Sequence, residues 1–133
     1  MALVQFHLAQ DSGVSYYVQI IQQVRQALLF GTLKRGDRLP TVKEVAAQVA
    51  VNPNTVLHAY RELEHEGLVV SRPGLGTFVT AAIPTTVAPA SYQSLRADLV
   101  RWIRKARTHG VDDGRLAALL AHVLRENAED VVA

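Results

Sequence analysis

Two helix start signals lie only eleven residues apart in the middle of this chain, and they constrain its fold more than any other feature. Thr41 followed three residues later by Glu44 is a capping box, in which the two side chains satisfy free backbone N–H groups at a helix start. Asn52 followed by Pro53 is a second start, because Asn is a favoured N-cap and proline is tolerated at the first helical position. The pattern predicts one short helix after Thr41 and another over about residues 53–66.

The second of these helices has a sharply divided surface. Its apolar residues recur at helical spacing on one face: Val56, Ala59, Tyr60 and Leu63. The polar residues remain outside: Asn54, Thr55, His58, Arg61 and Glu62. Two short helices joined by three or four residues are typical of a helix-turn-helix, in which the second helix enters the major groove of DNA.

The next stretch predicts a β-hairpin. Two β-prone runs, 68–70 and 77–79, enclose a turn over 71–76 that contains Pro73 and Gly74. Arg72 lies near the tip, where its charge and the exposed backbone N–H groups suit the phosphates of a duplex. A helical run over 15–30 precedes the motif, and residues 1–13 read as a short strand or an ordered arm. We therefore predict a mainly α (α+β) fold: a winged helix-turn-helix over residues 1–80 with a two-stranded wing.

These residues together carry a resemblance to a known family. The motifs that agree in order are Leu33, Gly36, Leu39-Pro40, Ala46, Asn52-Pro53-Asn54-Thr55-Val56, Ala59-Tyr60, Leu63, Gly67-Leu68-Val69 and Gly74-x-Gly76-Thr77-Phe78-Val79. In this pattern residues 15–80 resemble the GntR family of bacterial transcription regulators. The Asn-Pro-Asn-Thr turn and the short tail are similar to its YtrA-type branch. The resemblance implies a homodimeric repressor of a two-fold operator, with a small-molecule effector.

The chain departs from the family pattern at Lys43, where many members have arginine. Lysine keeps the charge but lacks the fork that pairs bidentately with guanine, so a phosphate contact is expected there instead of a base contact.

The candidate DNA-binding residues each have a structural alternative. Asn52 fits a helix cap as well as a contact, whereas Asn54 and Thr55 stand at the helix end that reads bases. His58 and Arg61 fit either DNA contacts or solvated surface. We expect Tyr60 in the core, with its hydroxyl free to reach a phosphate. The complete set of expected DNA contacts is Arg38, Lys43, Asn52, Asn54, Thr55, His58, Tyr60, Arg61, Arg72 and Gly74.

The last third of the chain reads as an appendage. Residues 81–90 contain two prolines and no charge, which is typical of an extended linker. Residues 91–133 predict a helix over 91–109 and another from about 115 to 129 after a cap at Asp112. Two helices alone cannot bury both apolar stripes, so we expect a second copy to cover them. The expected dimerisation residues are Leu95, Leu99, Trp102, Ile103, Leu116, Leu120 and Val123.

Composition narrows the remaining functions. The chain has 133 residues, no cysteine and a net charge of only +2, so DNA binding must depend on where the charges lie. The five histidines show no ligand-type spacing, so no metal or other cofactor is expected. No catalytic constellation stands out, and about fifty residues after the wing are too few for an aminotransferase-like domain.

Other readings of the chain are weaker than DNA binding. A winged-helix adaptor that binds protein is the alternative function, but the polar start of the second motif helix argues against it. The basic run over 101–107 reads as the solvated face of its helix more readily than as a phosphate site. The absence of a signal peptide and of a membrane-length apolar run leads us to expect a cytoplasmic protein with no membrane partner.

Overall fold

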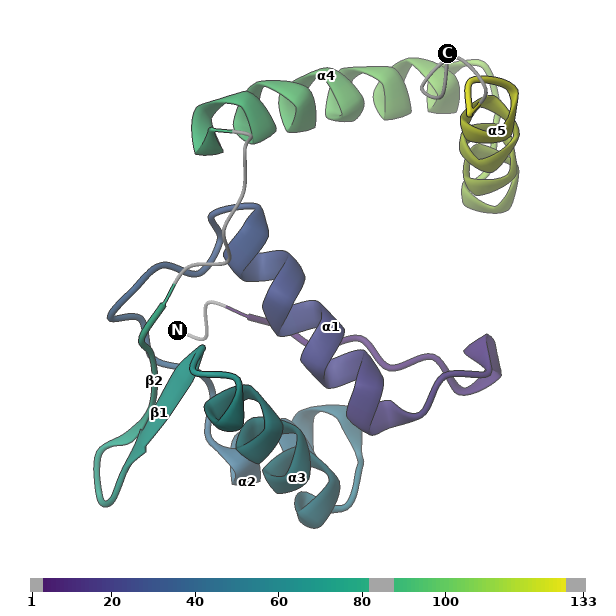
Figure 1. Cartoon of the computed structure of the whole chain (residues 1–133). Helices are drawn as coiled ribbons and strands as arrows, with labels where there is room; N and C mark the ends of the chain where they lie inside the picture. The colour runs from purple at the N-terminus through teal and green to yellow at the C-terminus, as the bar shows by residue number, and fades with distance from the viewer. Residues whose placement is uncertain (1–3, 82–87, 129–133) are drawn as a thin grey trace. The chain divides into compact units, whose positions relative to one another are not determined.

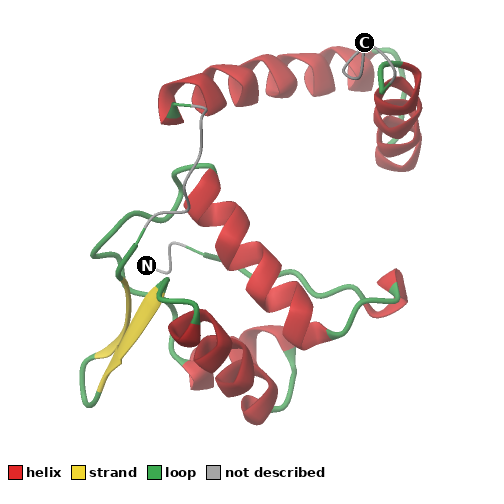
Figure 2. Ribbon diagram, viewed as in Figure 1, coloured by secondary structure: helices red, strands yellow, loops and turns green. Residues whose placement is uncertain are grey.

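The computed structural model of the chain describes residues 4–81 and 88–128 (Figure 1). The chain divides into two compact units, Met1–Pro89 and Ala90–Ala133. The first unit contains a 3₁₀ turn at Gln10–Ser12, three helices and one hairpin, and the second contains two helices (Figure 2). The mainly helical fold with a two-stranded wing that the sequence predicts is confirmed.

Helix α1, Tyr16–Leu29, begins where Ser15 accepts a hydrogen bond from the backbone N–H of Val18. Two glutamines of α1 also hold the N-terminal arm. The Gln23 side-chain amide accepts from the N–H of His7 at 3.0 Å and donates to its carbonyl at 2.6 Å. Gln19 makes the same pair of bonds with Ala9 at 2.8 and 2.9 Å. The arm is therefore ordered from residue 4 without forming a strand in its described part.

Helices α2, Val42–Val49, and α3, Pro53–His65, form the helix-turn-helix. Both predicted caps are present, since Thr41 accepts from the N–H of Glu44 at 3.0 Å and Asn52 accepts from that of Asn54 at 2.8 Å. Between the helices, Ala50 takes a left-handed backbone conformation with φ 53°. The turn thus contains a strained non-glycine residue that the sequence pattern did not indicate.

Strands β1, Val69–Arg72, and β2, Gly76–Val79, pair antiparallel, with Val70 opposite Phe78 and Arg72 opposite Gly76. The predicted turn over 71–76 is too long, because residues 71, 72 and 76 belong to the strands. A third segment extends this sheet. Arg38 forms an isolated bridge with Phe78, and the N–H of Leu39 donates to the carbonyl of Thr77 at 2.8 Å.

One core joins all elements of the first unit. Its buried apolar residues come from the arm, the three helices, the 33–39 segment and the hairpin: Val4, Phe6, Ile20, Val24, Leu28, Leu33, Leu39, Val45, Val56, Ala59, Tyr60, Leu63, Val69 and Val79. Helix α1 packs against α3, which in turn packs against α2 and β1. The inner face of α3 is thereby fixed and its polar face stays outside.

The second unit consists of α4, Pro89–Thr108, and α5, Asp113–Glu126. Asp112 caps α5 as predicted, accepting from the N–H of Arg115 at 2.9 Å. Two boundaries differ from the sequence prediction. Residues 89 and 90, expected in the linker, already lie in α4, because proline is tolerated in a first helical turn. Helix α5 ends three residues before the expected 129, which lies outside the described residues, as do linker residues 82–87.

Candidate nucleic-acid interface

The N-terminal end of α3 is the most polar exposed part of the helix-turn-helix. Asn52 and Asn54 are exposed and Thr55 is half-buried. The side-chain oxygen of Asn52 is occupied by the cap, and its backbone carbonyl accepts from the N–H of Thr55 at 2.9 Å. Because the cap holds the first turn rigidly, the side chains of Asn54 and Thr55 extend from a fixed backbone. Amide and hydroxyl groups of this kind can hydrogen-bond the edges of bases.

Farther along α3, His58 and Arg61 are exposed in different surroundings. The imidazole of His58 stacks on the ring of Tyr17 from α1, with centroids 4.3 Å apart and planes 28° apart. Arg61 borders a hollow of about 230 Å³ between α2, α3 and the wing, lined also by Val42, Leu57, Tyr60, Glu64, Ser71 and Thr77. His58 is thus oriented by a partner, whereas Arg61 lies beside open space.

The acidic residues of α3 are held at its flanks. Glu64 accepts a hydrogen bond from the backbone N–H of Ser71 at 2.5 Å, which ties α3 to the wing. Glu66 forms an ion pair with Arg25 of α1. Desolvation, together with the charges of Glu62 and Glu66, raises the pKa of the Tyr17 phenol. The negative charge of α3 therefore faces α1 and the wing, and the sequence pattern did not indicate these contacts.

Tyr60 lies in the core as predicted, but the expectation that its hydroxyl is free to reach a phosphate is wrong. The side chain is only 4% exposed, and its hydroxyl donates a hydrogen bond to the carbonyl of Pro40 at 2.6 Å. Burial, with a smaller contribution from Glu44, raises the pKa of this phenol above its usual value. Tyr60 therefore joins α3 to the segment before α2 and is not an outward contact.

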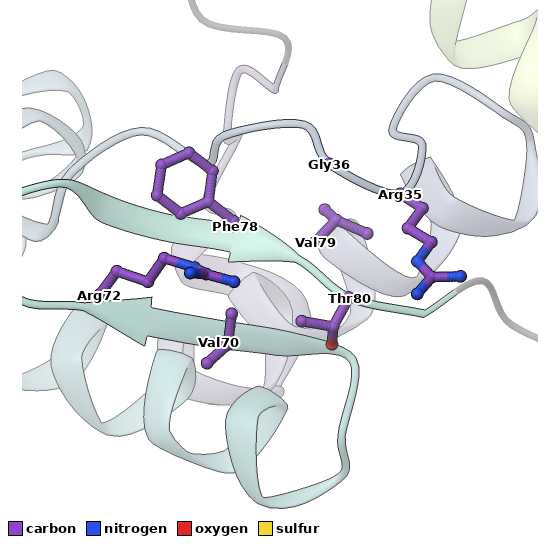
Figure 3. Close-up of a pocket in the computed structure, with 7 residues that line it drawn as sticks. All are labelled: Arg35, Gly36, Val70, Arg72, Phe78, Val79 and Thr80. Atoms are coloured by element: carbon purple, nitrogen blue, oxygen red, sulfur yellow. The ribbon is translucent and has the colours of Figure 1, made fainter.

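The wing presents arginine on one of its faces, which we call the outer face and define by Val70, Arg72 and Phe78. A hollow of about 370 Å³ lies along it, lined by Arg35, Gly36, Val70, Arg72, Phe78, Val79 and Thr80 (Figure 3). Figure 3 shows Arg72 extending along the hairpin toward Val70 and Phe78, with Arg35 at the other end of the hollow. Gly74 lies in the exposed turn with φ +76°.

Two further predicted contacts lie outside α3 and the hairpin. Lys43 is exposed on the first turn of α2. Arg38 is exposed in the segment that pairs with β2, so its place on the wing comes from sheet pairing rather than from its neighbours in sequence. Except for buried Tyr60, all the predicted DNA contacts have exposed or half-buried side chains, on α2, on α3 or on the wing with its pairing segment.

The predicted dimerisation residues lie on α4 and α5. Leu116 is buried and Trp102 and Ile103 are half-buried, whereas Leu95, Leu99, Leu120 and Val123 are exposed. Within the described residues, no group of histidine, aspartate or glutamate side chains could hold a metal ion, and no helix is long and apolar enough to cross a membrane. The features that can carry chemistry in the described part are therefore hydrogen-bonding and cationic groups suited to a polyanion.

Comparison with known proteins identifies the family. Residues 16–79 match the profile described as bacterial regulatory proteins, gntR family. The chain is 39% identical over 101 residues to the HTH-type transcriptional repressor YtrA of Bacillus subtilis strain 168, covering 76% of this chain and 78% of that protein.

Two solved structures are similar to this one. A transcriptional antiterminator from Listeria monocytogenes EGD-e has a TM-score of 0.58 and 26% identity, covering 99% of this chain and 96% of that one. YtrA from Sulfolobus acidocaldarius, a GntR-family transcription factor, has a TM-score of 0.54 and 28% identity, covering 74% of this chain and 97% of that one. The resemblance stated from the sequence is confirmed: the chain belongs to the gntR family of bacterial regulatory proteins, as a YtrA-like DNA-binding transcription regulator.

Proposed function

We propose that this protein represses transcription as a homodimer bound to a two-fold symmetric operator. Each copy places the start of α3 in a major groove, and the wing contacts the backbone beside it. The observation that carries the proposal is the exposed, capped polar start of α3 with Asn54 and Thr55. The similarity to regulators, one of them named a repressor, supports DNA rather than a protein as the partner.

The residues divide into two proposed roles. Asn54 and Thr55 read base edges, with His58 and Arg61 beside them. Asn52 mainly fixes the first turn of α3 through its cap. Lys43, Arg38, Arg72 and the backbone at Gly74 contact phosphates, which sets the register of the protein on the duplex without reading sequence.

Residues 91–133 are proposed to hold two copies together, with residues 81–90 as the linker and 1–80 as the reading unit. The support is the exposed apolar surface of α4 and α5. Half-sites about 34–36 Å apart, or a multiple of that spacing, suit a two-fold pair of recognition helices. A cytoplasmic location and release from DNA by a small-molecule effector complete the proposal, and both follow the family resemblance.

Substitution of Asn54 by alanine tests whether α3 reads sequence. We expect Asn54→Ala to weaken binding to the operator by about 1–3 kcal/mol, because one side chain that hydrogen-bonds a base edge is lost. Binding to random DNA should change little. A gel shift with the promoter upstream of its own gene, titrated beside a random duplex, measures both. Gln22→Ala, an exposed change on α1, is the control. Equal weakening on both duplexes would show that Asn54 does not read sequence.

A further inference from the structure

We propose that Gly76 is a positioning residue for DNA binding. Its lack of a side chain lets Arg38 lie across the outer face of the wing beside Arg72, so that the two guanidinium groups together hold one backbone phosphodiester of the duplex. This inference rests on the proposed function and deepens it. Arg38 and Arg72 have so far been separate phosphate contacts, and here they act as one site that a glycine makes available.

Sheet pairing brings the two arginines to the same face. Arg38 is bridged to Phe78, and Phe78 pairs with Val70, so these three residues form one row across the sheet. The next row toward the turn pairs Gly76 with Arg72. Side chains two residues apart along a strand share a face, so both rows belong to the outer face.

The space above Gly76 is filled by Arg38. A Cβ atom built on Gly76 would lie 2.8 Å from Nε of Arg38, 3.5 Å from its Cζ and 3.6 Å from its Cδ. A contact below 3.0 Å forces something to shift. The atoms that would shift belong to a flexible side chain rather than to backbone. Any larger residue at 76 would therefore displace the Arg38 guanidinium from its place opposite Arg72 while leaving the sheet paired.

The charge on this face is unbalanced. Within the described residues, neither Arg38 nor Arg72 forms an ion pair with a carboxylate. Asp37, the acidic residue adjacent to Arg38, instead accepts a hydrogen bond from the backbone N–H of Lys34 at 2.7 Å. Two cations on one face repel each other until an anion lies between them. A phosphodiester fits, because guanidinium groups present forked N–H donors that match phosphate oxygens.

A double-mutant cycle between Gly76→Ala and Arg38→Ala tests the inference in the full-length protein. We expect each single change to weaken operator binding about tenfold, the effect of losing one hydrogen bond to a charged group. The double variant should bind no more weakly than Arg38→Ala alone, because the arginine side chain that the added methyl group would displace is already absent.

Salt dependence supplies a second readout. Arg38→Ala should make the slope of log affinity against log salt shallower by about one unit, because one phosphate contact is lost. Gly76→Ala should reduce the slope as well, although it removes no charge. Backbone strain alone would not change the slope. Gly74→Ala is the matched control, since Gly74 also has positive φ (+76°) but nothing within 4 Å of a built Cβ.

Thermal unfolding of each variant shows whether the fold is intact. If Gly76→Ala proves unfolded, a cycle between Arg38→Gln and Arg72→Gln replaces it, and shared binding of one phosphate requires the double loss to be smaller than the product of the single losses. The inference is overturned if Gly76→Ala weakens binding equally with and without Arg38, or if the two arginine losses multiply independently. A wild-type protein without preference for its operator would instead contradict the proposed function.

Discussion

The two units of this chain treat their apolar side chains in opposite ways. In the first unit the large side chains of the inner faces are enclosed, and Ile20, Val45 and Leu63 are each 0% exposed. In the second unit Leu95 is 60% and Leu124 is 64% exposed, and Leu116 is the single buried residue in its described part. Both units were built from equally regular amphipathic helices.

The difference lies in the number of surfaces available to each helix. In the first unit α1, α2, the hairpin and the N-terminal arm all contact one another or α3, so every apolar stripe meets another. The second unit offers only two helices, and burial of apolar area contributes about 25 cal/mol per Å² only where a second surface removes it from water. A finished core and an unfinished one thus share a chain, and the unfinished one requires a partner.

Removing the second unit should produce the largest effect. A chain that ends at Ala81 should fold, because the first unit has its own core, and it should be monomeric. Linked reading heads commonly gain about 10²–10⁴ in avidity, so the cut protein should lose that factor on the whole operator and little on one half-site. Ultracentrifugation and titrations of whole and half operators measure both. A cut protein that stays dimeric would place the interface in the first unit.

Leucine-to-alanine changes in each unit should affect different measurements. Leu63→Ala should lower the free energy of unfolding by about 2–5 kcal/mol, because it leaves a cavity in a closed core. Leu120→Ala, at a residue 43% exposed, should leave the unfolding of the first unit unchanged and weaken dimerisation. Calorimetry and concentration-dependent sedimentation separate the two. Equal destabilisation of the first unit by both changes would contradict the division.

Tyr60→Phe tests the polar contact inside the finished core. The change removes the donor to the Pro40 carbonyl and leaves that oxygen buried without it, which should cost about 1–3 kcal/mol of unfolding free energy. Urea denaturation measures the loss. Tyr16→Phe, at a half-buried position on α1, should change stability by less than about 0.5 kcal/mol. No loss for Tyr60→Phe would mean that water replaces the phenol.

The same Ala-to-Gly change should have opposite signs in the two units. Ala50→Gly should stabilise the first unit by about 0.5–1 kcal/mol, because glycine adopts the left-handed φ of 53° without the strain that alanine bears. Ala97→Gly, inside α4, should destabilise its helix by about 1 kcal/mol through lost helix propensity. Thermal melts followed by circular dichroism give both shifts. A destabilising Ala50→Gly would show that the turn is not strained.

Prediction from sequence succeeded where the cause was local. The caps at Thr41, Asn52 and Asp112, and the inner face of α3, depend on residues within a few positions of each other, so a pattern can show them. Exposure of Asn54 and Arg72 followed from the same periodicity. The free hydroxyl of Tyr60 was a wrong expectation because its hydrogen-bond partner, Pro40, lies twenty residues away and no periodicity reveals it.

The sequence by itself determined the helices, their starts and stops, the hairpin and the polarity of each face, because short-range hydrogen bonds and side-chain periodicity act within one element. Only the tertiary structure decided which elements share a surface. It brought Arg38 to the wing through its bridge with Phe78, tied Glu64 to Ser71, and fastened the arm through Gln19 and Gln23. These contacts join distant residues, and the core that closes around α3 selects them from the many pairings that local patterns allow.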